Sequence, residues 1–196
     1  PAQGAALVWG RLLRVARRPC VDFPAFSMTA MTLPAFSTCD FCDAHKNDAS
    51  GEFRVLAAPW HSYGGVAAFA GQVTTVKCYE DNTQVKAAVE SPGHGRVLVV
   101  DGAGSRRRAL VGGNLAAAAA HNGWAGLVVY GCVRDVAELQ AAPVGIRALG
   151  LVPMPTERRG EGQRDVVVCI HGEWVRPGDW LYADADGIVV SSHSLT

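Results

Sequence analysis

Hydrophobic positions from residue 37 onward fall into two kinds of segment that alternate along the chain. The unbroken apolar runs at 97–100 and 126–130 are typical of strands that are buried on both faces. Between them, the alanine-rich stretch 114–121 predicts a helix. Residues 67–78, rich in valine and threonine, predict a strand that is interrupted at Gly71. This alternation predicts a sheet of strands covered by helices.

Shorter signals complete the predicted order of elements. Ser37 or Thr38 can cap a helix that runs to Ala44, because a hydroxyl there accepts a hydrogen bond from a free helical amide. Asp81 is placed to cap a second helix. The remaining predicted elements are a helical turn at 135–139 and strands at 146–152, 166–170, 173–175, 180–183 and 188–190. We therefore expect a single α/β domain with a mixed sheet, in which a β-α-β-α core precedes a β-rich layer.

The composition of the 196-residue chain favours a compact globular protein, since 49% of its residues are apolar and 18% are charged. Eighteen basic and eighteen acidic residues cancel, so we expect no direct binding to nucleic acid or to an anionic membrane. No apolar run approaches the roughly 20 residues that are needed to span a bilayer. These features predict a cytoplasmic protein.

Residues 1–27 differ from the rest, because they contain four arginines and a single acidic residue, Asp22. Such a stretch is typical of an organellar targeting segment. A tag, or sequence upstream of a start at Met28 or Met31, would give the same pattern. We therefore treat residues 1–30 as an N-terminal extension and residues 31–196 as the domain.

Glycine-rich sequences follow two of the predicted buried strands. The first begins at Asp101-Gly102 and leads to residues 112–115, and the second covers 130–135. In open α/β sheets, ligands bind beyond the carboxyl ends of the strands, where glycine lets the backbone approach them. Adjacent parallel strands would bring both segments to one edge of the sheet, so we expect a site there.

The side chains at this edge are suited to binding an enolate. Amides at the start of the helix near Asn114 can bind a carboxylate, and Arg134 offers a planar fork for a carboxylate or an enolate oxygen. Asp135 is a hard oxygen ligand for Mg²⁺ or Mn²⁺, and Glu138 would face the same side of a helical turn. Enolates are intermediates of aldol cleavage and of 2-oxo acid decarboxylation. A surface salt bridge or a helix cap would give the same local pattern.

The run Val-Leu-Val-Val-Asp-Gly-Ala-Gly at 97–104 resembles the first motif of nucleotide-binding and S-adenosylmethionine-binding folds. That motif needs glycines that lead directly into a helix and an acid at the end of the next strand. Here three arginines follow at 106–108, and Tyr130 ends the next apolar run. A methyltransferase is therefore disfavoured.

Residues 38–190 contain a series of short motifs. They are Thr-Cys-Asp-Phe-Cys-Asp-Ala at 38–44, Gly-Gln-Val-Thr-Thr-Val-Lys at 71–77, Asp-Asn at 81–82, the glycine-rich run at 96–105, Asn-Gly-Trp-Ala-Gly at 122–126, Tyr-Gly-Cys-Val-Arg-Asp at 130–135, Pro-Gly-Asp at 177–179 and Ala-Asp-Ala-Asp-Gly at 183–187. Taken in this order, the motifs resemble those of the RraA-like family, which includes 4-hydroxy-4-methyl-2-oxoglutarate aldolases and regulators of ribonuclease E activity.

The resemblance assigns roles to individual residues. Aldolases of the family have a glycine, twenty residues, Arg-Asp, two residues and an acid, and Gly113, Arg134, Asp135 and Glu138 match this pattern. It implies that Arg134 and Asp135 are catalytic, that Asp135 binds the metal, and that Glu138 supports the metal through water. The implied substrate-binding residues are Gly112, Gly113, Asn114, Leu115 and Arg134. Many aldolases of the family carry an acid where Gly113 stands, so the resemblance assigns no proton-transfer group.

The resemblance implies a swivelling β/β/α domain that forms homotrimers, sometimes stacked as hexamers. It also implies a divalent-metal-dependent (class II) aldolase that releases pyruvate from a 2-oxo acid and decarboxylates oxaloacetate. The alternative is a non-catalytic regulator that binds a ribonuclease E-type partner. The best-known member of that branch lacks the aspartate after the arginine, so Asp135 favours the enzyme.

Overall fold

The computed structural model describes residues 36–57 and 59–196, so the predicted N-terminal extension, residues 1–30, lies outside the described residues. The described helices are α1 Thr38–His45, α2 Thr83–Val89, α3 Gly113–His121 and α4 Val136–Ala141. The described strands are β1 Phe53–Val55, β2 His61–Ser62, β3 Phe69–Lys77, β4 Val97–Asp101, β5 Ala109–Val111, β6 Gly126–Val133, β7 Gly145–Leu151, β8 Gln163–Arg164, β9 Val168–Ile170, β10 Glu173–Val175, β11 Trp180–Ala183 and β12 Ile188–Ser191.

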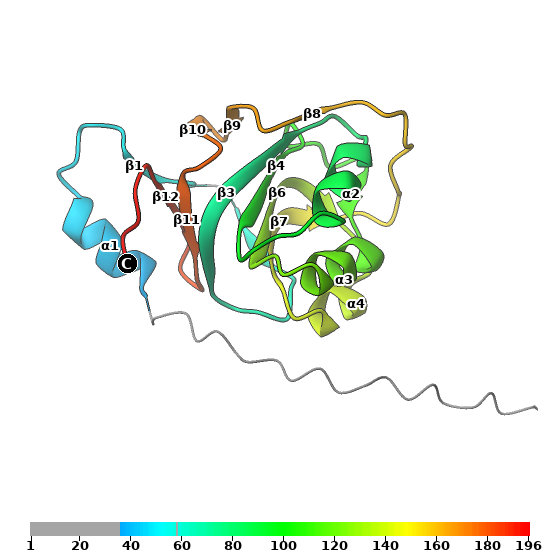
Figure 1. Cartoon of the computed structure of the whole chain (residues 1–196), viewed down its shortest axis with the longest axis horizontal. Helices are drawn as coiled ribbons and strands as arrows, with labels where there is room; N and C mark the ends of the chain where they lie inside the picture. Colours follow the sequence, from blue (N-terminus) through cyan, green and yellow to red (C-terminus); the bar gives the residue numbers. More distant parts are fainter. Residues whose placement is uncertain (1–35, 58) are drawn as a thin grey trace, which may run out of the picture. The chain divides into compact units, whose positions relative to one another are not determined.

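Four parallel strands, in the order β3-β4-β6-β7, form the centre of the sheet. Helices α2, α3 and α4 cover one face of these strands, as Figure 1 shows, and bury an apolar core between helices and sheet. All five residues of β4 are buried. The unbroken apolar run therefore marks a strand covered on both faces, as the sequence predicted.

The opposite face of the central strands is covered by β-structure. Strand β3 pairs with β4 on one side and, antiparallel, with β11 on the other, from which the sheet continues through β12 to β1. A second apolar core lies between this part and the central strands, and the β9-β10 hairpin contributes to it (Figure 1). The layers are thus β, β and α, and the predicted α/β class with a mixed sheet is confirmed.

Helix α1 packs on the β-rich layer, where the ring of Phe41 meets the buried ring of Tyr182 on β11 with 5.0 Å between centroids. Its N-cap is Ser37, whose hydroxyl accepts a hydrogen bond from the amide of Asp40 at 3.2 Å, as the sequence predicted. No helix in the described part of the chain is long and apolar enough to cross a membrane.

The structure differs from three predicted element boundaries. Strand β3 is not interrupted at Gly71 but runs through it, since Gly71 pairs with Leu181 of β11. Glycine is needed there because a side chain would collide with the backbone carbonyl oxygen of Gly95. Strand β6 continues past Tyr130 to Val133, so the loop that follows it is shorter than predicted. The helical turn expected at 135–139 is present as α4, but the helix begins one residue later, with Asp135 as its N-cap residue in a left-handed conformation.

The expected cap of α2 was correct in part. The helix begins one residue later than a cap at Asp81 requires, with Asn82 in the N-cap position. Asp81 nevertheless accepts a hydrogen bond from the amide of Thr83, at 2.7 Å, through its carboxylate oxygen Oδ1. Its side chain therefore satisfies one free amide at the start of the helix.

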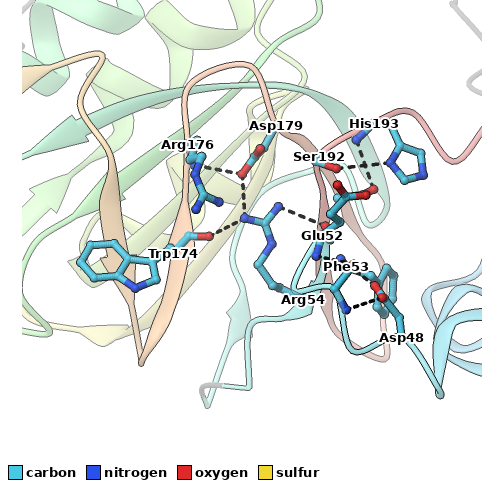
Figure 2. Close-up of polar contacts among 11 residues, drawn as sticks. Asp48, Glu52, Phe53, Arg54, Trp174, Arg176, Asp179, Ser192 and His193 are labelled. Carbon is cyan, nitrogen blue, oxygen red and sulfur yellow. Dashed lines mark hydrogen bonds and ion pairs between the residues drawn. The ribbon is translucent and has the colours of Figure 1, made fainter.

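A buried ion pair, Arg54 with Asp179, connects strands of the β-rich layer (Figure 2). The Arg54 guanidinium lies 3.1 Å from Asp179 Oδ2 and donates to the carbonyl oxygens of Trp174, at 2.7 Å, and Glu52, at 3.2 Å. Asp179 Oδ2 also accepts a hydrogen bond from the amide of Arg176 at 2.9 Å. This network joins β1 to β10 and to the turn before β11.

Candidate active site

A cavity of about 390 Å³ opens at the carboxyl ends of the parallel strands. The two glycine-rich segments that the sequence placed at one edge reach it only at their ends, the first at 112–115 and the second at 134–135, whereas residues 101–105 do not line it. The residues that line the cavity are Asn82, Ala109, Gly112, Asn114, Leu115, Arg134, Asp135, Pro155, Thr156 and Arg158. Five of the predicted site residues, Gly112, Asn114, Leu115, Arg134 and Asp135, are therefore brought together.

Arg134 and Asp135 are held at the end of β6. The amide of Arg134 donates to the carbonyl oxygen of Val111 at 3.0 Å, which ties the end of β6 to β5. Asp135 has a φ of +65°, a left-handed conformation that aspartate tolerates better than most residues do. This conformation turns its carboxylate toward α3, where Oδ2 accepts a hydrogen bond from the amide of Gly113 at 3.2 Å.

The two side chains form an exposed pair, with Arg134 Nε 3.4 Å from Asp135 Oδ2 and exposed fractions of 39% and 37%. Among the described residues, no hydrogen bond is made to the second carboxylate oxygen, Asp135 Oδ1. The pair therefore has an oxygen acceptor and guanidinium donors available to a ligand in the cavity.

The start of α3 provides a backbone amide to the same cavity. Gly112 is the N-cap residue and offers no side-chain cap. The amide of Gly113 is bonded to Asp135, whereas the amide of Asn114 has no hydrogen-bond partner among the described residues. An unpaired amide at the positive end of a helix can bind a carboxylate.

Gly113 and Glu138 do not line the cavity, but they lie against each other behind it. A Cβ atom on Gly113 would collide with the carboxylate of Glu138 and would lie 2.6 Å from its Cβ atom. A Cβ atom on Gly112 would likewise lie 2.6 Å from Asp135 Oδ2. The two glycines thus let the start of α4 approach the start of α3. This close approach explains why a glycine at 113 accompanies Arg134, Asp135 and Glu138 in the sequence pattern.

The donor set suits a magnesium-type ion. Within residues 36–57 and 59–196, no three His, Cys, Asp or Glu side chains lie close enough together to hold a metal ion by themselves. Mg²⁺ and Mn²⁺ do not require such a cage, because they keep several waters and bind through one or two carboxylates and substrate oxygens. Asp135, with its unbonded Oδ1, fits this role, and Glu138 in the first turn of α4 could support the ion through water.

The sequence profile of the family described as Aldolase/RraA matches residues 38–190. The chain belongs to the RraA-like family. The predicted resemblance is therefore confirmed.

Two curated relatives in the RraA-like family are provisionally named as 4-hydroxy-4-methyl-2-oxoglutarate aldolases. The protein from Albidiferax ferrireducens is 63% identical over 170 residues, which cover 83% of this chain and 98% of the relative. The protein from Burkholderia multivorans is 56% identical over 162 residues, which cover 82% and 99%.

Two solved structures share the RraA-like fold. The RNA-processing inhibitor RraA from Thermus thermophilis has a TM-score of 0.77 and 41% identity, covering 83% of this chain and 96% of that one. A Geobacillus kaustophilus protein described as an S-adenosylmethionine:2-dimethylmenaquinone methyltransferase has a TM-score of 0.76 and 44% identity, covering 82% and 97%. In the present chain the glycines after β4 lead into β5 rather than into a helix, which agrees with the absence of a nucleotide-binding fingerprint.

Sequence reasoning missed the part of the cavity that comes from residues 152–162, above all Thr156 and Arg158. This segment follows β7, which is parallel to β6, so it leaves the sheet at the same edge. The signal that could have found it is the charged run Glu-Arg-Arg at 157–159, directly after a predicted strand. Asn82, at the start of α2, was also missed as a lining residue.

Buried Asp81 anchors this segment. Its Oδ2 atom accepts hydrogen bonds from the amides of Arg159, at 2.6 Å, and Glu161, at 3.2 Å. Burial raises the pKa of Asp81, but hydrogen bonds from Thr83, Arg159 and Glu161 outweigh it and lower the pKa to about 2. Asp81 is therefore ionised at neutral pH and binds the segment to the start of α2.

Proposed function

We propose that this RraA-like protein is a divalent-metal-dependent (class II) aldolase that cleaves 4-hydroxy-4-methyl-2-oxoglutarate-type substrates to pyruvate and also decarboxylates oxaloacetate. The observation that carries the proposal is the exposed Arg134–Asp135 pair on the cavity, beside the unpaired amide of Asn114. The provisional names of relatives that are 63% and 56% identical support the choice of substrate.

In this proposal, different residues on the cavity bind different groups of the 2-oxo acid. The amide of Asn114 and the guanidinium of Arg134 bind the carboxylate next to the keto group, because both donate hydrogen bonds to an anion. Asp135 and, through water, Glu138 would hold Mg²⁺ or Mn²⁺ beside that group. When bound, the divalent ion supplies positive charge at the keto oxygen, where negative charge develops.

Both reactions break a carbon–carbon bond and leave the electron pair on the carbon next to the keto group. In the aldol cleavage, the bond to the hydroxyl-bearing carbon breaks, the hydroxyl gives its proton to solvent water, and this half leaves as a second 2-oxo acid. The enolate then takes a proton from water at the carbon that kept the electron pair and is released as pyruvate. In the decarboxylation, the same pair is left when carbon dioxide departs. Arg134 donates to the oxygen on which the resulting enolate carries its charge, so it stabilises the common intermediate more than the substrate.

Pyruvate release from 4-hydroxy-4-methyl-2-oxoglutarate and from oxaloacetate, measured with and without Mg²⁺ by a coupled assay, tests the proposal. We expect EDTA to abolish release of pyruvate from both substrates and Mg²⁺ or Mn²⁺ to restore it. Undiminished release in the presence of EDTA would contradict metal dependence. Failure to release pyruvate from either substrate in the presence of Mg²⁺ would contradict the proposed function.

A second candidate function is regulation of RNA processing by binding to a ribonuclease E-type enzyme. The observation that favours it is the similarity to the Thermus RNA-processing inhibitor, at 41% identity over most of both chains. The basic run at 106–108 offers a surface that a partner protein can contact, since the Arg107 side chain is 75% exposed. Binding of the purified protein to ribonuclease E at micromolar concentration would support regulation, whereas absence of binding would count against it.

A further inference from the structure

Arg158 is a charged side chain on the cavity to which the proposed reaction assigns no role. It is exposed, lines the cavity, and its Nε atom lies 3.3 Å from Asn82 Oδ1. Other arginines near it are paired: Arg159 lies 3.0 Å from Glu161, and Arg108 lies 3.6 Å from Glu157. In the part of the chain that the structure describes, Arg158 makes no ion pair with a carboxylate.

The backbone on both sides of Arg158 is held in place. On one side, the carbonyl oxygen of Met154 accepts a hydrogen bond from the amide of Ala109 at 2.8 Å, and that of Pro155 accepts one from Arg108 at 2.9 Å. On the other side, Asp81 accepts hydrogen bonds from the amides of Arg159 and Glu161. Arg158 therefore extends into the cavity from a short segment that is anchored at both ends.

The charges on the cavity are unequal. Its ionisable lining residues are two arginines, Arg134 and Arg158, and one acid, Asp135, which already accepts a hydrogen bond from Gly113 and pairs with Arg134. A 2-oxo acid that breaks into two 2-oxo acids carries a carboxylate at each end. Arg134 and the amide of Asn114 account for one of these anions, and the second needs its own partner once it leaves water.

We propose that Arg158 binds the distal carboxylate of the substrate and makes the cavity selective for 2-oxo acids that carry two carboxylates. This inference rests on the proposed function, since it takes the Arg134 side of the cavity as the place of the keto acid group. The planar guanidinium can form two parallel hydrogen bonds with a carboxylate, which fixes the distal end of the substrate. Arg158 is thus a specificity-determining residue rather than a catalytic one.

The test compares two probes with the same carbon skeleton, 2-oxoglutarate with two carboxylates and 2-oxopentanoate with one. Their dissociation constants are measured by calorimetry in the presence of Mg²⁺ for the full chain. We expect the unsubstituted protein to bind 2-oxoglutarate about tenfold more tightly than 2-oxopentanoate, because one partly exposed hydrogen bond between charged groups contributes about that much to affinity. Arg158→Gln should remove this preference without changing the binding of 2-oxopentanoate, and Arg158→Lys should keep part of it.

Arg159→Gln is the matched control, because its side chain is paired with Glu161 and does not line the cavity. It should leave both dissociation constants unchanged. The inference is overturned if Arg158→Gln weakens both probes equally, if it weakens neither, or if neither probe binds to the unsubstituted protein. Failure of the proposed function is recognised separately by the pyruvate assay, because the unsubstituted protein would then release no pyruvate from 4-hydroxy-4-methyl-2-oxoglutarate with Mg²⁺.

Discussion

The Arg54–Asp179 pair and the Arg134–Asp135 pair consist of the same chemical groups at similar separations, 3.1 Å and 3.4 Å. The side chains of the first pair are 5% and 7% exposed, and backbone groups of three other residues bond to them (Figure 2). The side chains of the second pair are more than a third exposed and face a cavity. One pair is enclosed by its own protein, and the other is open to a ligand.

The difference indicates a structural role for the first pair and supports the binding role that we propose for the second. A buried ion pair cannot lose one partner without leaving an uncompensated charge, so it matters for stability. An exposed pair contributes at most about 1 kcal/mol to folding. The left-handed backbone of Asp135, which aspartate tolerates better than most residues do, adds nothing to stability. The geometry of Arg134 and Asp135 therefore agrees with the binding role that we propose for the pair.

The largest effect is expected at the enclosed pair. Asp179→Ala should lower the free energy of unfolding by about 3–5 kcal/mol, because it leaves the buried Arg54 guanidinium without its anion. Urea denaturation measures this change. A loss below about 1 kcal/mol would show that the two pairs do not differ in the way proposed. Asp186→Ala, at an exposed position in a turn of the same layer, is the control and should change stability little.

At the open pair, the largest effect should fall on activity. Arg134→Lys removes the planar fork that we propose binds the enolate oxygen, and it should lower kcat/KM for oxaloacetate by about a hundredfold or more. The free energy of unfolding should change by no more than about 0.5 kcal/mol, since the side chain is exposed. Arg107→Lys, outside the cavity, should change neither quantity. A stability loss as large as that of Asp179→Ala would contradict the comparison.

The strands and helices that could be predicted from the sequence are those with a long hydrophobic pattern. The strands at 97–100 and 126–130 and the helix at 114–121 were correct because long apolar patterns dominate local preferences. Strands β1, β2, β5 and β8, of two or three residues each, have no measurable period and form only through pairing with distant strands.

The residues of the candidate site likewise fall into those that a neighbouring buried strand places and those that distant contacts place. Arg134 and Asp135 were found because they directly follow a buried strand, where the chain itself places them at the sheet edge. Arg158 was not found, because its position depends on hydrogen bonds that the amides of Arg159 and Glu161 donate to Asp81, about 80 residues away in the sequence. The collision that requires glycine at 113 depends on the approach of α4 to α3, which no local pattern encodes.

A smaller effect should appear in the acid range. Because the pKa of Asp81 is lowered to about 2 in the folded protein, from about 3.9 in an unfolded chain, Asp81 stabilises the fold above about pH 4. This stabilisation, about 2 kcal/mol, should be lost as the pH falls toward 2. Asp81→Asn should remove this part of the pH dependence in denaturation experiments at pH 5, 4, 3 and 2. Asp43→Asn, at an exposed position of α1, should leave it intact.

The smallest effect concerns the packing behind the open pair. Gly113→Ala should lower the free energy of unfolding by about 1–2 kcal/mol, because the added methyl group collides with Glu138. Combined with Glu138→Ala, which removes the obstructing carboxylate but keeps the Cβ atom of residue 138, the same change should cost less than it does alone. Calorimetric unfolding of the two single variants and the double variant measures this coupling. Additive losses would contradict the proposed contact.

The most direct test of the central claim, that the open pair serves binding and catalysis, compares Asp135→Asn with Asp179→Asn. Each variant is measured for Mg²⁺-dependent pyruvate release from oxaloacetate and for its free energy of unfolding. We predict that Asp135→Asn loses activity and keeps its stability, whereas Asp179→Asn loses stability and, while folded, keeps its activity. Full activity in Asp135→Asn would contradict the account.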